Sequence, residues 1–281
     1  MNTESKKVWF VTGTSKGLGL TLVKQLLNSG YKVAATTRNA EELKKAAGYS
    51  GENFLPLSVD LASEGSVANA LKEAVNTFGR VDVVVNNAGY GLTGGLEELT
   101  DHEARANFDV NVFGTLNVIR KALPYLRQQQ SGHIINISSI GGFTGLFPGF
   151  GVYCATKFAV QGLTESLAAE VKDFGIYATI VSPGYFRTSF LTGDSLRVPA
   201  QPIDAYRAVR ESQDAHQNSI NGNQPNDPEK GAAAIIAVTE HKNPPLHLFL
   251  GQDAYDFAGS KIELVKRDME EWKEVGTRVG F

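Results

Sequence analysis

The chain has 281 residues, of which 42% are hydrophobic and 20% are charged, and its formal net charge is −3. Because Lys and Arg do not cluster, nucleic acid and anionic membrane are excluded as main partners. The single cysteine, Cys154, excludes an internal disulfide and fits a reducing compartment. With no signal-peptide pattern and no apolar run near the roughly 20 residues of a membrane helix, we expect a cytoplasmic protein.

Strands and helices are predicted to alternate along the chain. Short apolar runs indicate strands at Val8–Val11, Lys32–Thr37, Phe54–Val59, Val81–Val85, His133–Ser138, Ile176–Ser182 and Leu246–Leu250. Helical spacing predicts helices at Leu18–Leu27, Ala40–Ala47, Ala62–Phe78, Thr100–Gln130, Val152–Phe174, Pro228–Glu240 and Asp253–Val275. The pattern predicts an α/β fold: one domain over 1–281, a Rossmann-type doubly wound parallel sheet of about seven strands with helices on both faces.

The segment 184–228 interrupts this alternation. It contains several Pro, Gly and Asn residues around a short helix predicted at Asp204–Asn218. It also carries Phe186, Phe190, Leu191 and Leu196, apolar side chains that need something to cover. We therefore predict a lid over the substrate, with a rigid additional helix as the alternative.

A glycine-rich loop joins the first strand to the first helix. Gly13, Gly17 and Gly19 give the spacing G-x-x-x-G-x-G, with Ser15, Lys16 and Leu18 between them. Glycines allow a tight turn and a close approach of backbone to pyrophosphate, and the helix N-terminus supplies free N–H groups and partial positive charge. The alternative is a purely structural turn, but the position between strand and helix favours a dinucleotide site.

Five motifs in order resemble the short-chain dehydrogenase/reductase family. They are the glycine loop after Thr12, Asn86-Asn87-Ala88-Gly89 after the fourth strand, Ser138-Ser139, Tyr153-x-x-x-Lys157, and Pro183-Gly184. The resemblance is close from Val8 to Thr188 and looser beyond. It implies that Asn87, Ala88 and Gly89 pass near the adenosine, that Asp60 and Leu61 contact the adenine, and that Thr188 bonds the nicotinamide carboxamide. Asp60 alone would equally fit a helix cap.

The end of the second strand bears on the choice between NADP(H) and NAD(H). An acidic residue there binds the ribose 2′-hydroxyl of NAD, whereas arginine accommodates the 2′-phosphate of NADP. This chain has Thr37 followed by Arg38, and Lys16 supplies a second cation. We therefore expect NADP(H), although both cations would also fit solvated surface positions.

Tyr153 and Lys157 lie four residues apart and so share one face of a predicted helix. The resemblance makes Tyr153 the general acid or base and Lys157 its partner, whose ammonium we expect to lower the pKa of the phenol. It makes Ser139 the group that bonds the substrate oxygen, with Ser138 as the alternative. It also makes Asn111 the holder of a water that relays protons to Lys157; a polar residue on a helix face is the alternative.

The five histidines are scattered and Cys154 has no partner thiol, so we expect no metal and an inert cysteine that points to another face than Tyr153. The predicted pocket residues are Phe143, Leu146, Phe147, Phe150, Phe186, Phe190 and Leu191. They favour an apolar ketone, aldehyde or alcohol. The pattern resembles the hydroxysteroid and retinol dehydrogenases and the bacterial carbonyl reductases of the family. A non-catalytic NADP(H)-binding sensor is the alternative, and an assembly of two or four copies is left open.

Overall fold

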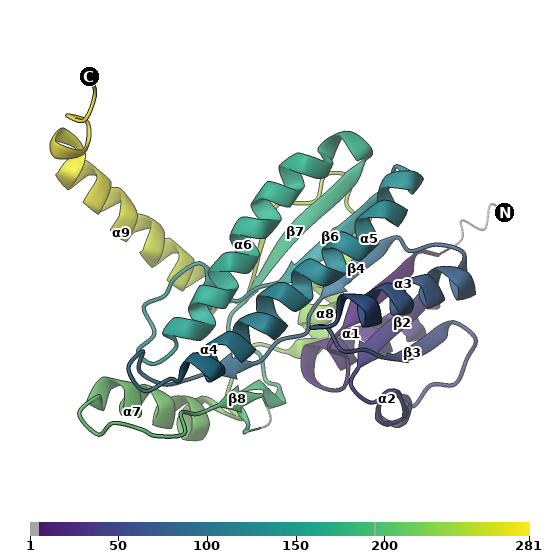
Figure 1. Ribbon diagram of the computed structural model, residues 1–281, viewed down its shortest axis with the longest axis horizontal. Coiled ribbons are helices and arrows are strands. Elements are labelled where there is room, and N and C mark those ends of the chain that lie inside the picture. Colours follow the sequence, from purple (N-terminus) through teal and green to yellow (C-terminus); the bar gives the residue numbers. More distant parts are fainter. Residues whose placement is uncertain (1–5, 194) are drawn as a thin grey trace.

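The computed structural model describes residues 6–193 and 195–281, and its centre is a seven-stranded parallel sheet (Figure 1). The strand order is β3-β2-β1-β4-β6-β7-β9, and every neighbouring pair is parallel. Their bounds are β1 (Val8–Thr12), β2 (Lys32–Thr37), β3 (Phe54–Ser58), β4 (Val83–Asn86), β6 (Gly132–Ile137), β7 (Ile176–Pro183) and β9 (His247–Leu250). The order reverses direction between β1 and β4, which is where this kind of sheet binds ligands. The predicted fold class is confirmed.

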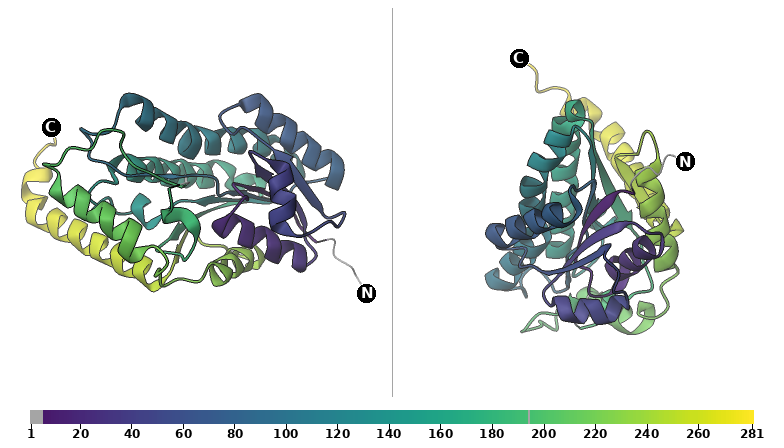
Figure 2. Two further views of the ribbon diagram at one scale, coloured as in Figure 1. Left: turned by 90° about the horizontal axis from the view of Figure 1, so that it is seen from below. Right: turned by 90° about the vertical axis from the view of Figure 1, so that its right-hand side faces the viewer.

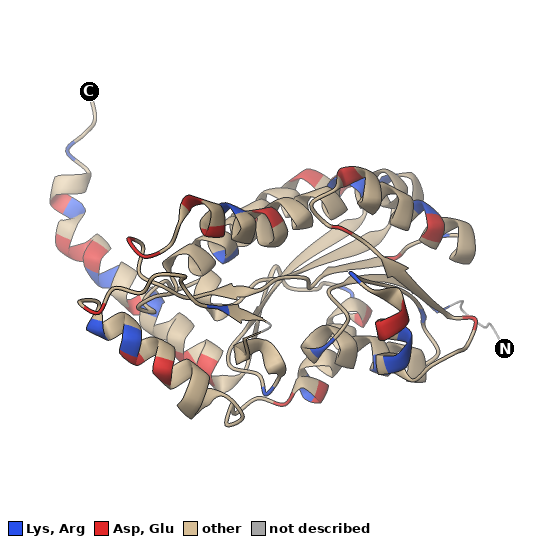
Figure 3. Cartoon of the chain, turned by 60° about the horizontal axis from the view of Figure 1, so that its bottom comes forward, with Lys and Arg blue, Asp and Glu red and all other residues tan. Residues whose placement is uncertain are grey.

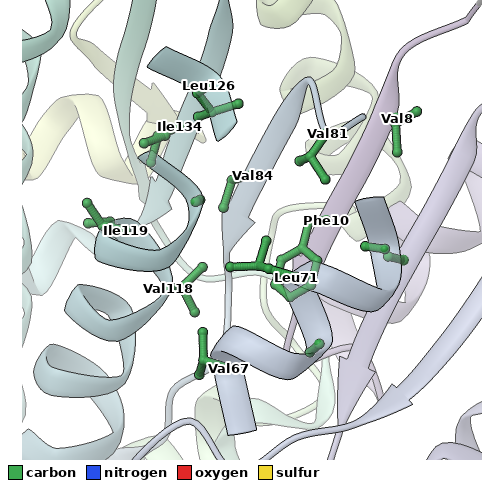
Figure 4. Packing of buried hydrophobic residues seen from close by; sticks show 14 of the residues in the cluster. Val8, Phe10, Val67, Leu71, Val81, Val84, Val118, Ile119, Leu126 and Ile134 are labelled. Atoms are coloured by element: carbon green, nitrogen blue, oxygen red, sulfur yellow. The ribbon is translucent and has the colours of Figure 1, made fainter. Parts of the chain in front are cut away.

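Helices cover both faces of the sheet (Figure 2). A core cluster on one face is built from α3 (Glu64–Phe78), α5 (Thr115–Gln129) and α6 (Gly151–Val171) against the strands; Figure 4 shows part of it. The other face is covered by α1 (Gly17–Asn28) and α8 (Pro228–Glu240), joined at its edge by Leu43 of α2 (Ala40–Ala47). Because β1 and β4 contribute to both clusters, their runs of apolar residues are buried on both sides.

The helix predicted at Thr100–Gln130 is present but not uniform. It consists of α4 (Asp101–Phe108), a π-helical segment η1 (Asp109–Gly114), and α5. Thr100 caps its start in a capping box with Glu103. The π segment carries Asn111, and such segments often lie at functional sites.

The segment 184–228 is largely structured. It contains η4 (Ser189–Leu191), β8 (Leu196–Arg197), α7 (Arg207–Asp214) and a second π segment, η5 (Ala215–Ile220). The predicted helix Asp204–Asn218 therefore begins and ends slightly later. Strand β8 pairs with β5 (Gly91–Leu92), a two-stranded sheet that the sequence did not predict.

Glu98, in the loop before α4, fastens this segment to the body. Its buried carboxylate accepts hydrogen bonds from the backbone N–H of Gly95 and of Ile203 and forms an ion pair with Arg210 of α7 at 2.5 Å. Burial alone would raise the pKa of Glu98, but the two N–H donors and Arg210 lower it overall. The carboxylate therefore stays ionised and holds α7 in place.

The last helix, α9 (Gln252–Gly276), begins against the body and its later part extends away from the body (Figure 1). Acidic and basic residues alternate with other residues along this helix (Figure 3). Ala254 and Ala258 near its start are buried, whereas the residues after position 264 are exposed. Short 3₁₀ segments complete the described chain: η2 (Ile140–Gly142) after β6, and η3 (Lys172–Phe174) after α6, where a helix to Phe174 was expected.

Candidate active site

The glycine loop lies at the carboxyl end of β1 and opens α1. Gly13 has φ +69°, and a Cβ there would lie 2.5 Å from the Cα of Ala88, so only glycine fits between the two loops. The first turn of α1 has no side-chain cap and no acidic residue. Its N–H groups are therefore available to an anion, which fits a pyrophosphate.

The motif after β4 braces this loop. The Thr12 hydroxyl accepts hydrogen bonds from the N–H groups of Asn87 and Ala88, both at 3.1 Å. The Asn87 amide in turn donates to the carbonyls of Thr12 and Gly13. Asn86 is buried and bonds Asn136 of β6, which extends the network across the sheet. Asn87 is thus a structural brace of the phosphate loop as well as a lining residue.

Residues expected around the adenosine line one continuous cavity of about 640 Å³. Thr37 ends β2 there and Arg38 follows it, Lys16 lies in the glycine loop, and Asp60 and Leu61 follow β3. Arg38 is exposed and has no ion pair within the part of the chain that the structure describes, so its guanidinium is available to a ligand. Asp60 accepts a hydrogen bond from the N–H of Ala62 and so also serves as a local turn residue.

Tyr153 and Lys157 project from α6 into the same cavity, and both are nearly fully buried. The Lys157 ammonium donates to the Ile137 carbonyl at 2.9 Å and lies 5.9 Å from the centre of the Tyr153 ring. The Ser139 hydroxyl hydrogen bonds to Tyr153 and accepts from the N–H of Gly141. Tyr153 and Lys157 of α6 therefore meet the Ser139 hydroxyl, which comes from the turn between β6 and η2.

The expected lowering of the Tyr153 pKa is wrong for this site without a bound cofactor. Burial raises the pKa of the phenol above its usual range, the hydrogen bond to Ser139 offsets part of this, and Cys154 and Tyr185 raise it further. Burial also lowers the pKa of Lys157 to about 8. Desolvation outweighs the attraction because both groups lie out of water. Tyr153 is therefore protonated at neutral pH and available as an acid.

The two serines differ in their surroundings. Ser138 donates to the Lys157 carbonyl at 3.1 Å and accepts from the Gln161 amide, so it ties β6 to α6. Ser139 lies beside the Tyr153 phenol. This difference supports Ser139 over Ser138 as the substrate-binding serine.

Asn111 does not line the cavity; its neighbour Val110 does. The Asn111 amide donates to the Tyr90 carbonyl and the Thr156 hydroxyl and accepts from the N–H of Tyr90. Its side chain therefore joins the loop after β4 to α6 and positions the helix that carries Tyr153. The water relay to Lys157 stays a prediction.

The chain after β7 forms the opposite wall. Pro183, Gly184 and Thr188 line the cavity as expected, and a Cβ placed on Gly17 would lie 3.5 Å from the Cβ of Thr188. The glycine loop and the segment after β7 thus face each other across the entrance. These two segments contain the residues that would hold a nicotinamide dinucleotide, which would supply or accept a hydride.

The rest of the cavity wall is mostly apolar. Phe147, Phe150, Phe186, Phe190 and Leu191 line it as predicted. Two predictions are wrong: Phe143 packs on Phe249 in a separate cluster, and Leu146 is exposed on the surface. Both follow η2 in a loop whose direction the sequence pattern does not reveal.

Cys154 also lines the cavity, contrary to the expectation that it points to another face. Its thiol is buried among Phe150, Tyr153 and Leu191, and burial raises its pKa to about 11. The thiol therefore stays neutral and acts as a small apolar wall group. Within the described residues no group of three His, Cys, Asp or Glu could hold a metal ion, and no helix is long and apolar enough to cross a membrane.

Tyr185, which directly follows Pro183-Gly184, lines the cavity as expected, whereas His216 and Gln224 are among the lining residues that were not predicted. The Tyr185 hydroxyl lies 2.9 Å from Nε2 of His216, and Gln224 is buried with both amide atoms unpaired in the described structure. His216 and Gln224 reach the cavity only through the three-dimensional path of the segment 184–228, which the sequence pattern does not predict.

Comparison with known proteins agrees with this geometry. A sequence model described as short chain dehydrogenase matches residues 7–196. Oxidoreductase BOA17 of Botryotinia fuckeliana is 38% identical over 96% of this chain and 97% of its own length. A 3-ketodihydrosphingosine reductase of Bacteroides thetaiotaomicron is 36% identical over 87% of this chain and 88% of its own.

Solved structures extend the comparison to three dimensions. A short-chain dehydrogenase from Streptomyces avermitilis superposes with a TM-score of 0.88 at 36% identity, covering 96% of this chain and 98% of that one. ElxO with NADP bound gives 0.72 at 30% identity, covering 87% and 96%. A 3-ketoacyl-(acyl-carrier-protein) reductase from Brucella melitensis, complexed with NADH, gives 0.71 at 26% identity over the same shares. The chain therefore belongs to the short-chain dehydrogenase/reductase family and is an oxidoreductase that uses a nicotinamide cofactor.

Proposed function

We propose that this chain is an NADP(H)-dependent carbonyl reductase and alcohol dehydrogenase of the cytoplasm, acting on apolar ketones, aldehydes or secondary alcohols. The observation that carries the proposal is the convergence of Tyr153, Lys157 and Ser139 in a cavity whose wall includes many apolar side chains. The name of the 3-ketodihydrosphingosine reductase relative supports a ketone as the substrate.

Arg38 supports the choice of NADP(H). Relatives in structure hold NADP in one case and NADH in another, so the choice depends on this chain's own residues. At the end of β2 it has Thr37 and exposed Arg38, with Lys16 across the cavity, and no carboxylate takes the position that would bind a 2′-hydroxyl. A guanidinium bonds a phosphate dianion in bidentate fashion.

The roles of the catalytic residues follow from their surroundings. When bound, the nicotinamide supplies or accepts the hydride. Ser139 bonds the carbonyl oxygen of the substrate, and Tyr153 donates its phenol proton to that oxygen, so a carbonyl becomes an alcohol. Lys157, held by the Ile137 carbonyl, bonds the ribose hydroxyls and stabilises the phenolate that remains. In oxidation the same proton returns to Tyr153.

The segment 184–228 completes this proposal as a substrate lid over a single domain. Its residues Phe186, Phe190 and Leu191 form one wall of the cavity, and Glu98 fixes its position through Arg210. Closure over the apolar wall would exclude water from the reacting carbon.

A screen of ketones and aldehydes against the purified protein tests the proposal, with NADPH and NADH compared at equal concentration by their absorbance. We expect consumption of NADPH with aromatic or long-chain ketones and much slower consumption of NADH. Binding of NADPH without turnover of any carbonyl or alcohol would favour the sensor, and a preference for NADH would contradict the role of Arg38.

A further inference from the structure

Gln224 lines the active-site cavity with an amide that has no partner. It is 1% exposed, and neither Nε2 nor Oε1 has a hydrogen-bond partner within the described structure. Buried amides are nearly always paired, so an unpaired amide facing a cavity indicates that a ligand group satisfies it. The chain around it is tied to the stretch after β7, because its carbonyl accepts from Arg187 and Asn226 bonds Tyr185.

The Tyr185–His216 pair adds a second polar element to the same cavity. Nδ1 of His216 lies 2.7 Å from the Ser212 carbonyl, which only accepts, so Nδ1 carries the proton. Nε2 therefore accepts from the Tyr185 hydroxyl at 2.9 Å. Burial keeps both groups neutral, since it lowers the pKa of His216 and raises that of Tyr185 to about 12. The phenol oxygen of Tyr185 keeps a free lone pair.

We propose that Gln224 and the Tyr185–His216 pair bind a second polar group of the substrate, a hydroxyl, so that the preferred substrates are apolar ketones that also carry a hydroxyl. A hydroxyl accepts from Nε2 of Gln224 and donates to its Oε1 or to the Tyr185 oxygen, which matches the donor and acceptors that these lining residues offer. The inference rests on the proposed carbonyl reductase function.

Aromatic side chains connect the two polar elements. The Phe150 ring lies 6.4 Å from Tyr153 and 4.6 Å from His216, centre to centre. The proton donor and His216 therefore pack against the same aromatic ring. A substrate with its carbonyl at Tyr153 would place a hydroxyl about one ring away, across an apolar scaffold.

Benzylacetone and its para-hydroxy derivative form a matched probe pair. We would measure their dissociation constants by calorimetry on the complex with NADP⁺, which cannot reduce them, in wild type, Gln224→Leu and the exposed control Gln201→Leu. We expect wild type and the control to prefer the hydroxy ketone, and Gln224→Leu to lose about tenfold of this preference, as for one buried hydrogen bond.

The outcomes separate three cases. An unchanged preference in Gln224→Leu would overturn the inference, as would weaker NADP⁺ binding in this variant, because Gln224 would then serve the cofactor. The binding comparison needs no turnover. A failure of the wild type to reduce either ketone with NADPH would therefore count against the proposed function and not against Gln224.

Discussion

At the residue scale, burial and charge act against each other at Tyr153 and Lys157. Burial favours the neutral form of each, so the phenol keeps its proton while the pKa of the lysine falls to about 8. The free site is therefore prepared for reduction, in which Tyr153 gives up a proton. Oxidation needs the phenolate, which additional positive charge in the cavity would stabilise.

Lys157→Met keeps the buried stem and removes the charge. We expect a loss of NADPH affinity and a fall in kcat of about 10²–10⁴-fold, because the ammonium serves both cofactor position and proton transfer. Fluorescence titration and steady-state rates measure the two effects, with Lys172→Met in the short helix η3 as the control. A fall in kcat with unchanged NADPH affinity would restrict Lys157 to proton transfer.

Arg38 is the residue that we expect to determine the preference for NADPH over NADH. Arg38→Asp removes the phosphate partner and supplies a carboxylate for the 2′-hydroxyl. The Michaelis constant for NADPH should rise by about ten- to a hundredfold, as expected for a lost charge-assisted bond, while use of NADH improves. The exposed control Arg127→Asp should leave both unchanged. An unaltered ratio of NADPH to NADH activity would remove Arg38 from the site.

At the element scale, Glu98 is one of the side chains that hold the segment 184–228 against the body. Its carboxylate bonds Ile203 and pairs with Arg210. Glu98→Gln should speed hydrogen exchange over residues 203–216 and raise the substrate Michaelis constant more than it lowers kcat, because the lid is loosened while Tyr153 is untouched. Glu73→Gln, at an exposed position on α3, is the control.

Hydrogen exchange also tests whether this segment is a lid at all. Exchange across residues 186–225 should be fast in the free protein and slow down when NADPH and an unreactive substrate analogue are added. Equal protection in both states would identify a rigid extension of the core.

The elements themselves show what the sequence could predict. Buried strands such as Val83–Asn86 and capped helices such as Pro228–Glu240 follow from local pattern, and the motif residues Tyr153, Lys157 and Gly13 lie together as expected. The π segments did not follow, because one extra residue in a turn leaves helical periodicity almost unchanged. These segments matter for the site because Asn111 and His216 both lie on them.

At the scale of the whole molecule, His133 links stability to pH. Thr179 donates its proton to the Pro245 carbonyl, so the buried His133 ring donates from Nε2 to Thr179 and is neutral. Burial, with a contribution from Lys7, lowers its pKa from 6.5 to about 4. The unfolded chain therefore binds more protons below pH 6.5, and stability is lost as the pH falls from about 6.5 towards 4.

This loss should reach up to about 3 kcal/mol in the free energy of unfolding. Urea titrations at several pH values measure it. His133→Gln should flatten the dependence over this range, whereas the exposed control His102→Gln should not. A parallel slope in His133→Gln and wild type would assign the acid sensitivity to other groups.

Tyr153 is proposed to transfer the proton in an NADPH-dependent carbonyl reduction. Tyr153→Phe keeps the ring and removes only the hydroxyl, so the decisive measurement is NADPH binding and ketone turnover on the same protein sample, with Tyr177→Phe as the control. We expect Tyr153→Phe to bind NADPH with unchanged affinity and to lose about 10²–10⁴-fold in turnover. A variant that binds NADPH and keeps most of the wild-type turnover would contradict it.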